Sequence, residues 1–148
     1  MNKILVTPRS LTKHGHPALE KLRQAGYQLV FSAPGDLPAE EELVQLAPGC
    51  AGYLAGVEKI TERVLAAGDH LRVISRNGTG IDNIDVAAAQ QRGIRICRAE
   101  GANARGVAEL TLALTLALAR SIPFSDATLK DGGWERRQGT ELEGRTLG

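Results

Sequence analysis

The sequence predicts an α/β protein built around a parallel β-sheet, and two observations carry this prediction. Along the first hundred residues, short aliphatic runs alternate with segments whose apolar residues recur at helical spacing. Glycine follows several of the helical segments and leads within a few residues into the next strand-like run. A helix between each pair of strands carries the chain back across the sheet, so the strands should pair in parallel.

Five aliphatic runs have the length of short strands. They are residues 3–7, 28–32, 52–55, 72–75 and 94–97. Five such strands flanked by helices predict a flavodoxin-like sheet, in which ligands bind beyond the carboxyl ends of the strands. The loops that follow Ala55, Ser75 and Cys97 are therefore the candidate binding loops.

Four segments between these strands predict helices, at residues 17–25, 39–46, 61–67 and 86–91. Gly26, Gly68 and Gly93 should end three of them, because glycine adopts the left-handed conformation common just past a helix.

After Arg98 the sequence changes character. Residues 103–120 predict one long helix that is apolar on nearly every face and should therefore be buried all round. Ser121 is the expected N-cap of a second helix, with Pro123 near its first turn. Residues 134–148 are polar and predict a loop.

Composition predicts a folded, soluble, cytoplasmic protein. Basic and acidic side chains number 18 and 17, with no block of like charge, which disfavours nucleic-acid binding. The longest apolar run, residues 107–119, contains Glu109 and is shorter than the roughly 18 residues that span a bilayer. Cys50 and Cys97 form no C-x-x-C pair and are expected to be reduced thiols.

Residues 75–85 are the most informative segment, and they superficially match a dinucleotide fingerprint. The spacing is G-x-G-x-x-N, with Asn83 where that motif has glycine or alanine, and Arg98 stands where it has an acid. A pyrophosphate loop is therefore disfavoured, although Arg98 could be read as a ligand for the 2′-phosphate of NADP.

The same glycines allow a ligand to approach the backbone closely. A small carboxylate could bind the amides of Gly78, Thr79 and Gly80. The alternative is a tight turn in which Asp85 caps the next helix, and the spacing alone does not choose between the two.

No metal site is expected. His14 and His16 have alternate spacing, but no cysteine or carboxylate cluster accompanies them, so a surface turn is the favoured interpretation. His70 is expected in a solvated loop. The sequence contains no G-x-S-x-G, Walker or H-E-x-x-H motif, so hydrolase and kinase functions have no support from a local motif.

Two separated motifs resemble the D-isomer-specific 2-hydroxyacid dehydrogenase family, of the phosphoglycerate dehydrogenase type. They are Arg-Asn-Gly-Thr-Gly-Ile-Asp-Asn-Ile-Asp at residues 76–85 and Asn-Ala-Arg-Gly-Val-Ala-Glu at residues 103–109. The resemblance covers residues 52–148 and is weaker before them. It implies an incomplete substrate-binding domain at residues 1–98. Residues 99–148 would be a linker helix and the first helices of an NAD-binding Rossmann domain that is otherwise absent, because the chain stops before its GxGxxG loop.

The resemblance further implies an oxidoreductase that transfers a hydride between NAD(H) and a small D-2-hydroxy acid or 2-oxo acid, resembling phosphoglycerate or hydroxypyruvate. The implied substrate-binding residues are Asn77, Gly78, Thr79, Gly80 and Asn103. Those near the cofactor are Thr79, Ala104 and Val107, where Ala104 replaces a frequent serine or threonine. Leu54, Ala55 and Gly56 would border the same cleft.

The family's catalytic arginine, acidic partner and acid-base histidine lie later than this sequence reaches, so no catalytic residue is assigned and the chain alone is expected to be inactive. Family members commonly dimerise through the region of residues 103–120, which implies a homodimer. An alternative is a non-catalytic, NAD-linked interaction module resembling the related corepressors. A flavodoxin-like receiver or flavin domain is the least favoured, because residues 7–12 match a phosphate loop only vaguely.

Overall fold

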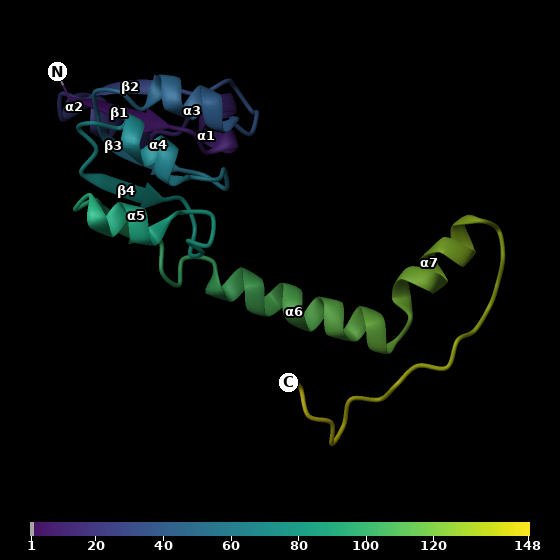
Figure 1. The fold of residues 1–148 in the computed structure, drawn as a ribbon. Helices are drawn as coiled ribbons and strands as arrows, with labels where there is room; N and C mark the ends of the chain where they lie inside the picture. The colour runs from purple at the N-terminus through teal and green to yellow at the C-terminus, as the bar shows by residue number, and fades with distance from the viewer. Residues whose placement is uncertain (1) are drawn as a thin grey trace. The chain divides into compact units, whose positions relative to one another are not determined.

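The computed structural model describes residues 2–148, which form two compact units. The first ends at Ala102 and contains the sheet, and the second runs from Asn103 to Gly148 (Figure 1).

The first unit is a five-stranded parallel sheet, as predicted, with strand order β2-β1-β3-β4-β5. The strands are β1 (Lys3–Val6), β2 (Gln28–Phe31), β3 (Cys50–Ala55), β4 (Val73–Arg76) and β5 (Arg95–Arg98). Each lies within two residues of its predicted bounds. This is the flavodoxin-like order, in which the chain reverses direction beside β1.

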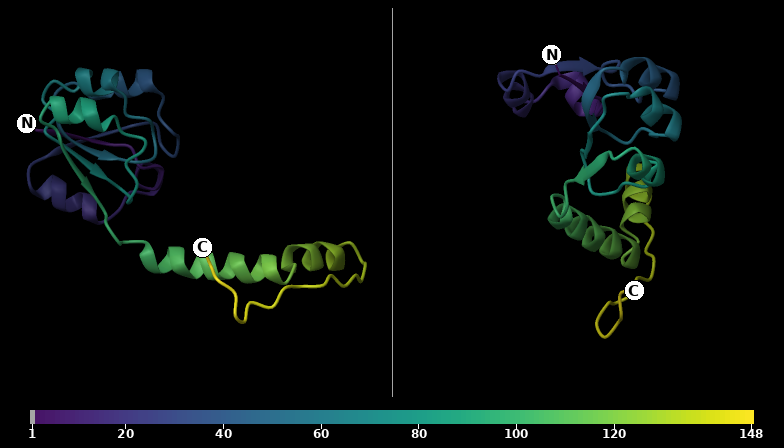
Figure 2. Two further views of the ribbon diagram at one scale, coloured as in Figure 1. Left: turned by 60° about the horizontal axis from the view of Figure 1, so that its bottom comes forward. Right: turned by 60° about the vertical axis from the view of Figure 1, so that its left-hand side comes forward.

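Five helices connect these strands: α1 (Arg9–His14), α2 (Ala18–Gln24), α3 (Glu40–Leu46), α4 (Glu62–Ala67) and α5 (Val86–Gln91). Helices α3, α4 and α5 cover one face of the sheet, and α1 and α2 lie toward the other (Figure 2). This division follows from right-handed crossovers in a sheet that grows in two directions from β1.

Two local expectations need correction. Helix α1 was not predicted, and His14 is its last residue, so the segment before Gly15 is helical and only the residues after it turn. Gly68 ends α4 as predicted, but its φ of −81° is not left-handed, whereas Gly26 and Gly93 do have positive φ.

The core of the first unit lies between the sheet and helices α3 to α5. Leu5, Tyr53 and Ile74 come from the central strands, and Leu43 and Leu65 pack on them from α3 and α4, all nearly or wholly without exposed surface. Burying each large apolar side chain contributes about 1.5–3 kcal/mol. This core fixes the carboxyl ends of β1, β3 and β4.

The second unit consists of α6 (Ala104–Ala119), α7 (Ile122–Lys130) and a segment from Asp131 onward without helix or strand, as predicted. The expectation that the long helix is buried all round is wrong for the residues described. None of α6 is buried, and its alternating leucines from Leu110 to Leu118 are 51–77% exposed. Ser121 stands before α7 as predicted, but its φ of 53° is left-handed and its side chain makes no capping hydrogen bond.

Within residues 2–148, no single helix is long and apolar enough to cross a membrane. Helices α6 and α7 meet those criteria only when taken together, and they are bent by 66° at the break between them.

Candidate functional site

Two loops leave the same edge of the sheet side by side. The β3–α4 loop covers residues 56–61, and the β4–α5 loop covers residues 77–85. Ala55 and Arg76, the last residues of β3 and β4, are paired in register. The Asn77 N–H donates to the Ala55 carbonyl at 2.8 Å, which continues the pairing into the loops.

After Asn77, the β4–α5 loop has three successive backbone amides without an acceptor among the described residues. Among residues 2–148, no group accepts a hydrogen bond from the N–H of Gly78, Thr79 or Gly80. Gly78 and Thr79 are half-buried, while Asn77 and Gly80 are exposed. Successive amides without internal partners suit an anion such as a carboxylate.

Arg76 shapes this amide segment from beneath. Its Nη1 donates to the Asn77 carbonyl at 2.8 Å, and its buried Nε has no partner among the described residues. A Cβ added at Gly78 would lie 2.9 Å from the same Nη1, and Gly78 has a φ of 156°. A side chain at position 78 would therefore strain the backbone and displace the Arg76 guanidinium, which places positive charge beside the amides.

The β3–α4 loop is built on a buried carboxylate, Glu58, that is only 1% exposed. Its Oε1 accepts hydrogen bonds from the Tyr53 hydroxyl at 2.9 Å, from the Gly56 N–H at 2.9 Å and from the Thr7 hydroxyl. Burial, with the adjacent Glu58 carboxylate second, raises the pKa of Tyr53, so its hydroxyl remains a hydrogen-bond donor. All three partners donate, and this carboxylate needs no cation to satisfy Oε1.

Sequence reasoning missed Glu58. The sequence there is a Glu58-Lys59 pair between Val57 and Ile60, shortly after a strand, and a solvent-facing glutamate gives the same pattern.

Asn83 joins the two loops. Its side-chain Nδ2 donates to the Glu58 carbonyl at 2.7 Å and to the Gly56 carbonyl at 3.3 Å. It occupies the position where a dinucleotide fingerprint has glycine or alanine, neither of which could make these bonds.

Both helices that follow these loops are capped. The Asp85 carboxylate accepts from the Ala88 N–H at 3.0 Å, which is the cap of α5 that the tight-turn alternative included. The Thr61 hydroxyl accepts from the Val64 N–H at 3.4 Å at the start of α4. These caps stabilise the first turns of α4 and α5, directly after the two loops.

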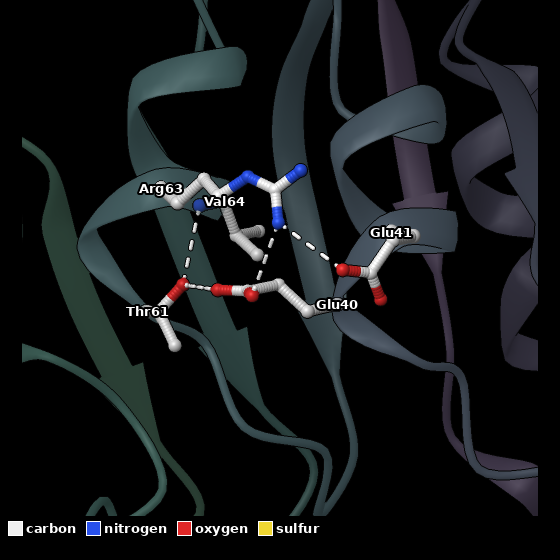
Figure 3. A network of polar contacts seen from close by, with 5 residues as sticks. All are labelled: Glu40, Glu41, Thr61, Arg63 and Val64. Carbon is white, nitrogen blue, oxygen red and sulfur yellow. Dashed lines mark hydrogen bonds and ion pairs between the residues drawn. The ribbon is translucent and has the colours of Figure 1, made fainter.

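Figure 3 shows how Thr61 also ties α4 to the start of α3. The Thr61 hydroxyl donates to Glu40, and the Arg63 guanidinium bridges Glu40 and Glu41 at 3.3 Å and 3.1 Å. A hydrogen bond from the backbone N–H of Glu41 and another from Arg63 lower the pKa of the Glu41 carboxyl.

The structure brings some of the predicted site residues together. Asn77, Gly78, Thr79 and Gly80 lie in one loop. Beside it are Leu54 and Ala55 at the end of β3, and Gly56 directly after them. The remaining three, Asn103, Ala104 and Val107, belong to the second unit, where they stand at the start of α6 and are exposed.

The other sequence candidates contribute no constellation. Arg98, considered as a phosphate ligand, pairs with Glu100 at 2.7 Å. Among residues 2–148, no group of three or more histidine, cysteine or acidic side chains is arranged to hold a metal ion. His70 is exposed in a loop, as predicted.

A family model described as "D-isomer specific 2-hydroxyacid dehydrogenase, catalytic domain" matches residues 5–143. D-3-phosphoglycerate dehydrogenase of Homo sapiens is 42% identical over 113 residues, which are 74% of this chain and 21% of that protein. D-3-phosphoglycerate dehydrogenase of Synechocystis sp. is 36% identical over an alignment that takes in 100% of this chain and 26% of that protein. Hydroxypyruvate reductase of Thermotoga maritima is 40% identical over 74% of this chain and 37% of its own length.

Solved structures show the same relationship. A Thermus thermophilus protein superposes with a TM-score of 0.80 and 31% identity, covering 95% of this chain and 45% of that one. NAD+-bound 3-phosphoglycerate dehydrogenase of Entamoeba histolytica has a TM-score of 0.71 and 27% identity, covering 95% of this chain and 43% of that one. The chain thus spans between about a fifth and two fifths of the curated relatives it matches.

Proposed function

This chain belongs to the D-isomer specific 2-hydroxyacid dehydrogenase family, and from that premise we propose that it forms part of an NAD-dependent oxidoreductase. The reaction is hydride transfer between NAD(H) and a small D-2-hydroxy acid or 2-oxo acid. Residues 1–98 serve as the substrate-binding domain, and residues 99–148 as the linker and first helices of the NAD-binding domain. Relatives named D-3-phosphoglycerate dehydrogenase and hydroxypyruvate reductase support a phosphoglycerate-like or hydroxypyruvate-like substrate.

One observation carries the proposal: three successive amides, at Gly78, Thr79 and Gly80, have no acceptor among residues 2–148 and lie at the carboxyl edge of the sheet. They bind the substrate carboxylate, and Arg76 adds positive charge beneath them. Every substrate of this class has that carboxylate, whereas its other substituents vary. A backbone site therefore recognises the class and leaves the choice of acid to other residues.

Asn77 and Asn103 contribute further substrate contacts, and the Asn103 amide offers both a donor and an acceptor. Thr79, Ala104 and Val107 lie along the nicotinamide end of the cofactor. Ala104 and Val107 are both exposed, which leaves them accessible for such a contact.

The bound cofactor would supply the hydride-transfer chemistry, as donor in the NADH form and as acceptor in the NAD+ form. The residues described here hold the carboxylate and orient the reacting carbon, which is the positioning part of catalysis. No acid-base residue is assigned among them. Arg76 and Arg98 are engaged with Asn77 and Glu100, which supports binding and structural roles for these two side chains.

The test is turnover by the full-length protein that contains this chain. NADH oxidation is followed with hydroxypyruvate, glyoxylate, pyruvate and phosphohydroxypyruvate, and NADPH is tried in parallel. We expect NADH oxidation with at least one of these acids. A folded protein that binds NADH but oxidises it with none of the acids overturns the proposed activity.

The exposed leucines of α6 favour a homodimer formed through residues 103–120, since an apolar helix surface of this extent requires a partner. The same exposed leucines could contact a different protein, which is what the second candidate function requires. That function is an NAD-linked interaction module without turnover. A dimer that binds NAD(H) and a protein partner but turns over no 2-oxo acid would favour that second function.

A further inference from the structure

We propose that Asn83 is a positioning residue, which holds the β4–α5 loop against the β3–α4 loop so that the Gly78–Gly80 amides face the substrate carboxylate. The inference rests on the proposed function for what the loop binds. The tie between the two loops is a separate claim, which can be tested without any substrate.

Asn83 contributes three of the hydrogen bonds between the loops. Its Nδ2 donates to the carbonyls of Glu58 and Gly56 at 2.7 Å and 3.3 Å, and its own carbonyl accepts from the Ile60 N–H at 2.8 Å. The Ile60 carbonyl then accepts from the Asp85 N–H at 2.9 Å. The side-chain bonds link residues 25 and 27 positions apart, so Asn83 is not merely completing a local turn.

The carbonyls that Asn83 contacts are themselves fixed. Gly56 donates to the buried Glu58 carboxylate, which also accepts from Thr7 at the end of β1 and from Tyr53 within β3. A Cβ at position 56 would lie 2.7 Å from Glu58 Oε2 and 3.1 Å from the Pro8 Cα, so the Gly56 backbone sits directly against both. The support for the amide segment therefore runs from β1 and β3 through Glu58 to Asn83.

This arrangement argues against a direct substrate contact by Asn83. Both of its amide hydrogens are directed at main-chain carbonyls, which leaves no donor for a ligand. A displacement of about 1 Å in a binding loop can reduce turnover by about a hundredfold, so a tie of this kind acts on catalysis at a distance.

The first experiment replaces Asn83 with Asp and with Ala in the full-length protein. Asn83→Asp keeps the shape but sets a carboxylate against two carbonyls, and Asn83→Ala only removes the donors, so it remains informative if the aspartate variant misfolds. We expect KM for the 2-oxo acid to rise about tenfold, and the Kd for NADH to change much less, because Thr79 is the one residue of this segment assigned to the cofactor. Gln91→Ala is the matched control, because Gln91 is exposed at the end of α5, away from the amide segment, and its side chain makes no hydrogen bond to another described residue.

Two variants of Glu58 test whether its hydrogen bonds anchor the β3–α4 loop. Glu58→Gln retains an oxygen that can accept from Tyr53, Thr7 and Gly56, whereas Glu58→Leu removes all three bonds. We expect the leucine variant to raise KM in the same way as Asn83→Ala, and the glutamine variant to stay close to wild type. Equal losses in both Glu58 variants would contradict the anchoring role.

Amide hydrogen exchange tests the tie independently of activity. Asn83→Ala should accelerate exchange of amides in residues 56–60, which lie in the loop that was not mutated. Unchanged exchange there overturns the inference. Faster exchange with an unchanged KM also overturns it, because Asn83 would then support only the fold. A wild-type enzyme without turnover defeats the proposed function, and exchange still decides whether Asn83 couples the loops.

Discussion

The backbone conformation of Gly78 bears directly on the proposed carboxylate site. In Gly78→Ala, the new Cβ would lie 2.9 Å from Arg76 Nη1 at a φ of 156°. We expect this strain in the folded protein to lower the free energy of unfolding by about 1–3 kcal/mol. In the full-length enzyme, KM for the 2-oxo acid should rise at least about tenfold, since the amides are displaced.

Gly52→Ala is the control for this variant. A Cβ there meets Ile4 and Val73 at ordinary contact distances of 3.5 Å and 3.6 Å, so KM should not change. If Gly78→Ala leaves KM at the wild-type value, the amide segment is not where the carboxylate binds.

Tyr53 gives a pH dependence of stability. Burial raises its pKa in the folded protein, while the unfolded chain releases the phenol proton above about pH 10. The unfolded state then binds fewer protons than the native state, so the free energy of unfolding falls as pH rises, by about 1.4 kcal/mol per pH unit. Urea denaturation of the 148-residue chain from about pH 9 upward should show this slope developing around pH 10 and reaching its full value only above about pH 11.

Tyr53→Phe should lower the stability at neutral pH, because Glu58 loses one donor, but it should remove this part of the alkaline slope. Burial also raises the pKa of Cys50, and that contribution is common to both proteins. Identical slopes in the two proteins would show that the phenol ionises without unfolding.

At the scale of the element, the start of α4 carries both a helix cap and a surface ion pair, and the two should differ in their contribution to stability. Thr61→Ala should destabilise the 148-residue chain by about 1 kcal/mol, since both the cap of α4 and the hydroxyl bond to Glu40 are lost. Arg63→Met should hardly change the denaturation midpoint, because the Arg63 side chain is 58% exposed and its ion pairs are screened by water. A larger loss of stability for Arg63→Met than for Thr61→Ala would show that the ion pairs, and not the cap, stabilise the start of α4.

The sequence predicted elements well where one signal dominated. Aliphatic runs located all five strands, and Asp85 identified the start of α5, because a side chain that can cap a helix leaves a local pattern. Helix α1 was missed because its six residues follow Pro8 directly and carry no apolar stripe. The cap expected at Ser121 failed because a left-handed backbone turns the side chain away from the free amides of α7.

The sequence likewise predicted one part of the candidate site and missed another. The Gly78–Gly80 amides could be predicted from glycine spacing, because the absence of Cβ is a local property. Glu58 and the role of Asn83 could not, because their hydrogen bonds join loops more than twenty residues apart. Only the pairing of β3 with β4 brings these loops together.

At the scale of the whole molecule, the exposed leucines of α6 predict self-association of the full-length protein. Leu112 and Leu116 are one helical turn apart and 60% and 51% exposed. Replacing both with Glu should weaken a dimer at least about a hundredfold, as measured by sedimentation equilibrium, because charges would be buried at its centre. Asp126→Asn on α7 is a surface control, and a wild-type protein that stays monomeric at high concentration refutes the dimer.

The 148-residue chain alone should not oxidise NADH with any 2-oxo acid. The described residues supply a carboxylate site but no assigned acid-base group, and hydride transfer requires cofactor, substrate and proton donor within a few ångströms. Measurable turnover by pure chain, above that of a Gly78→Ala preparation, would show that the reacting groups lie within these residues after all.

The strand order has a consequence for synthesis on the ribosome. β1 lies beside both β2 and β3, β4 joins β3, and β5 joins β4. Each strand therefore emerges after the neighbour on which it will pair, and the sheet can grow outward from β1 without waiting for a distant partner. Nascent chains in which Ala67 has emerged from the ribosome should already protect β1 from proteolysis, whereas those in which β3 has not yet emerged should not.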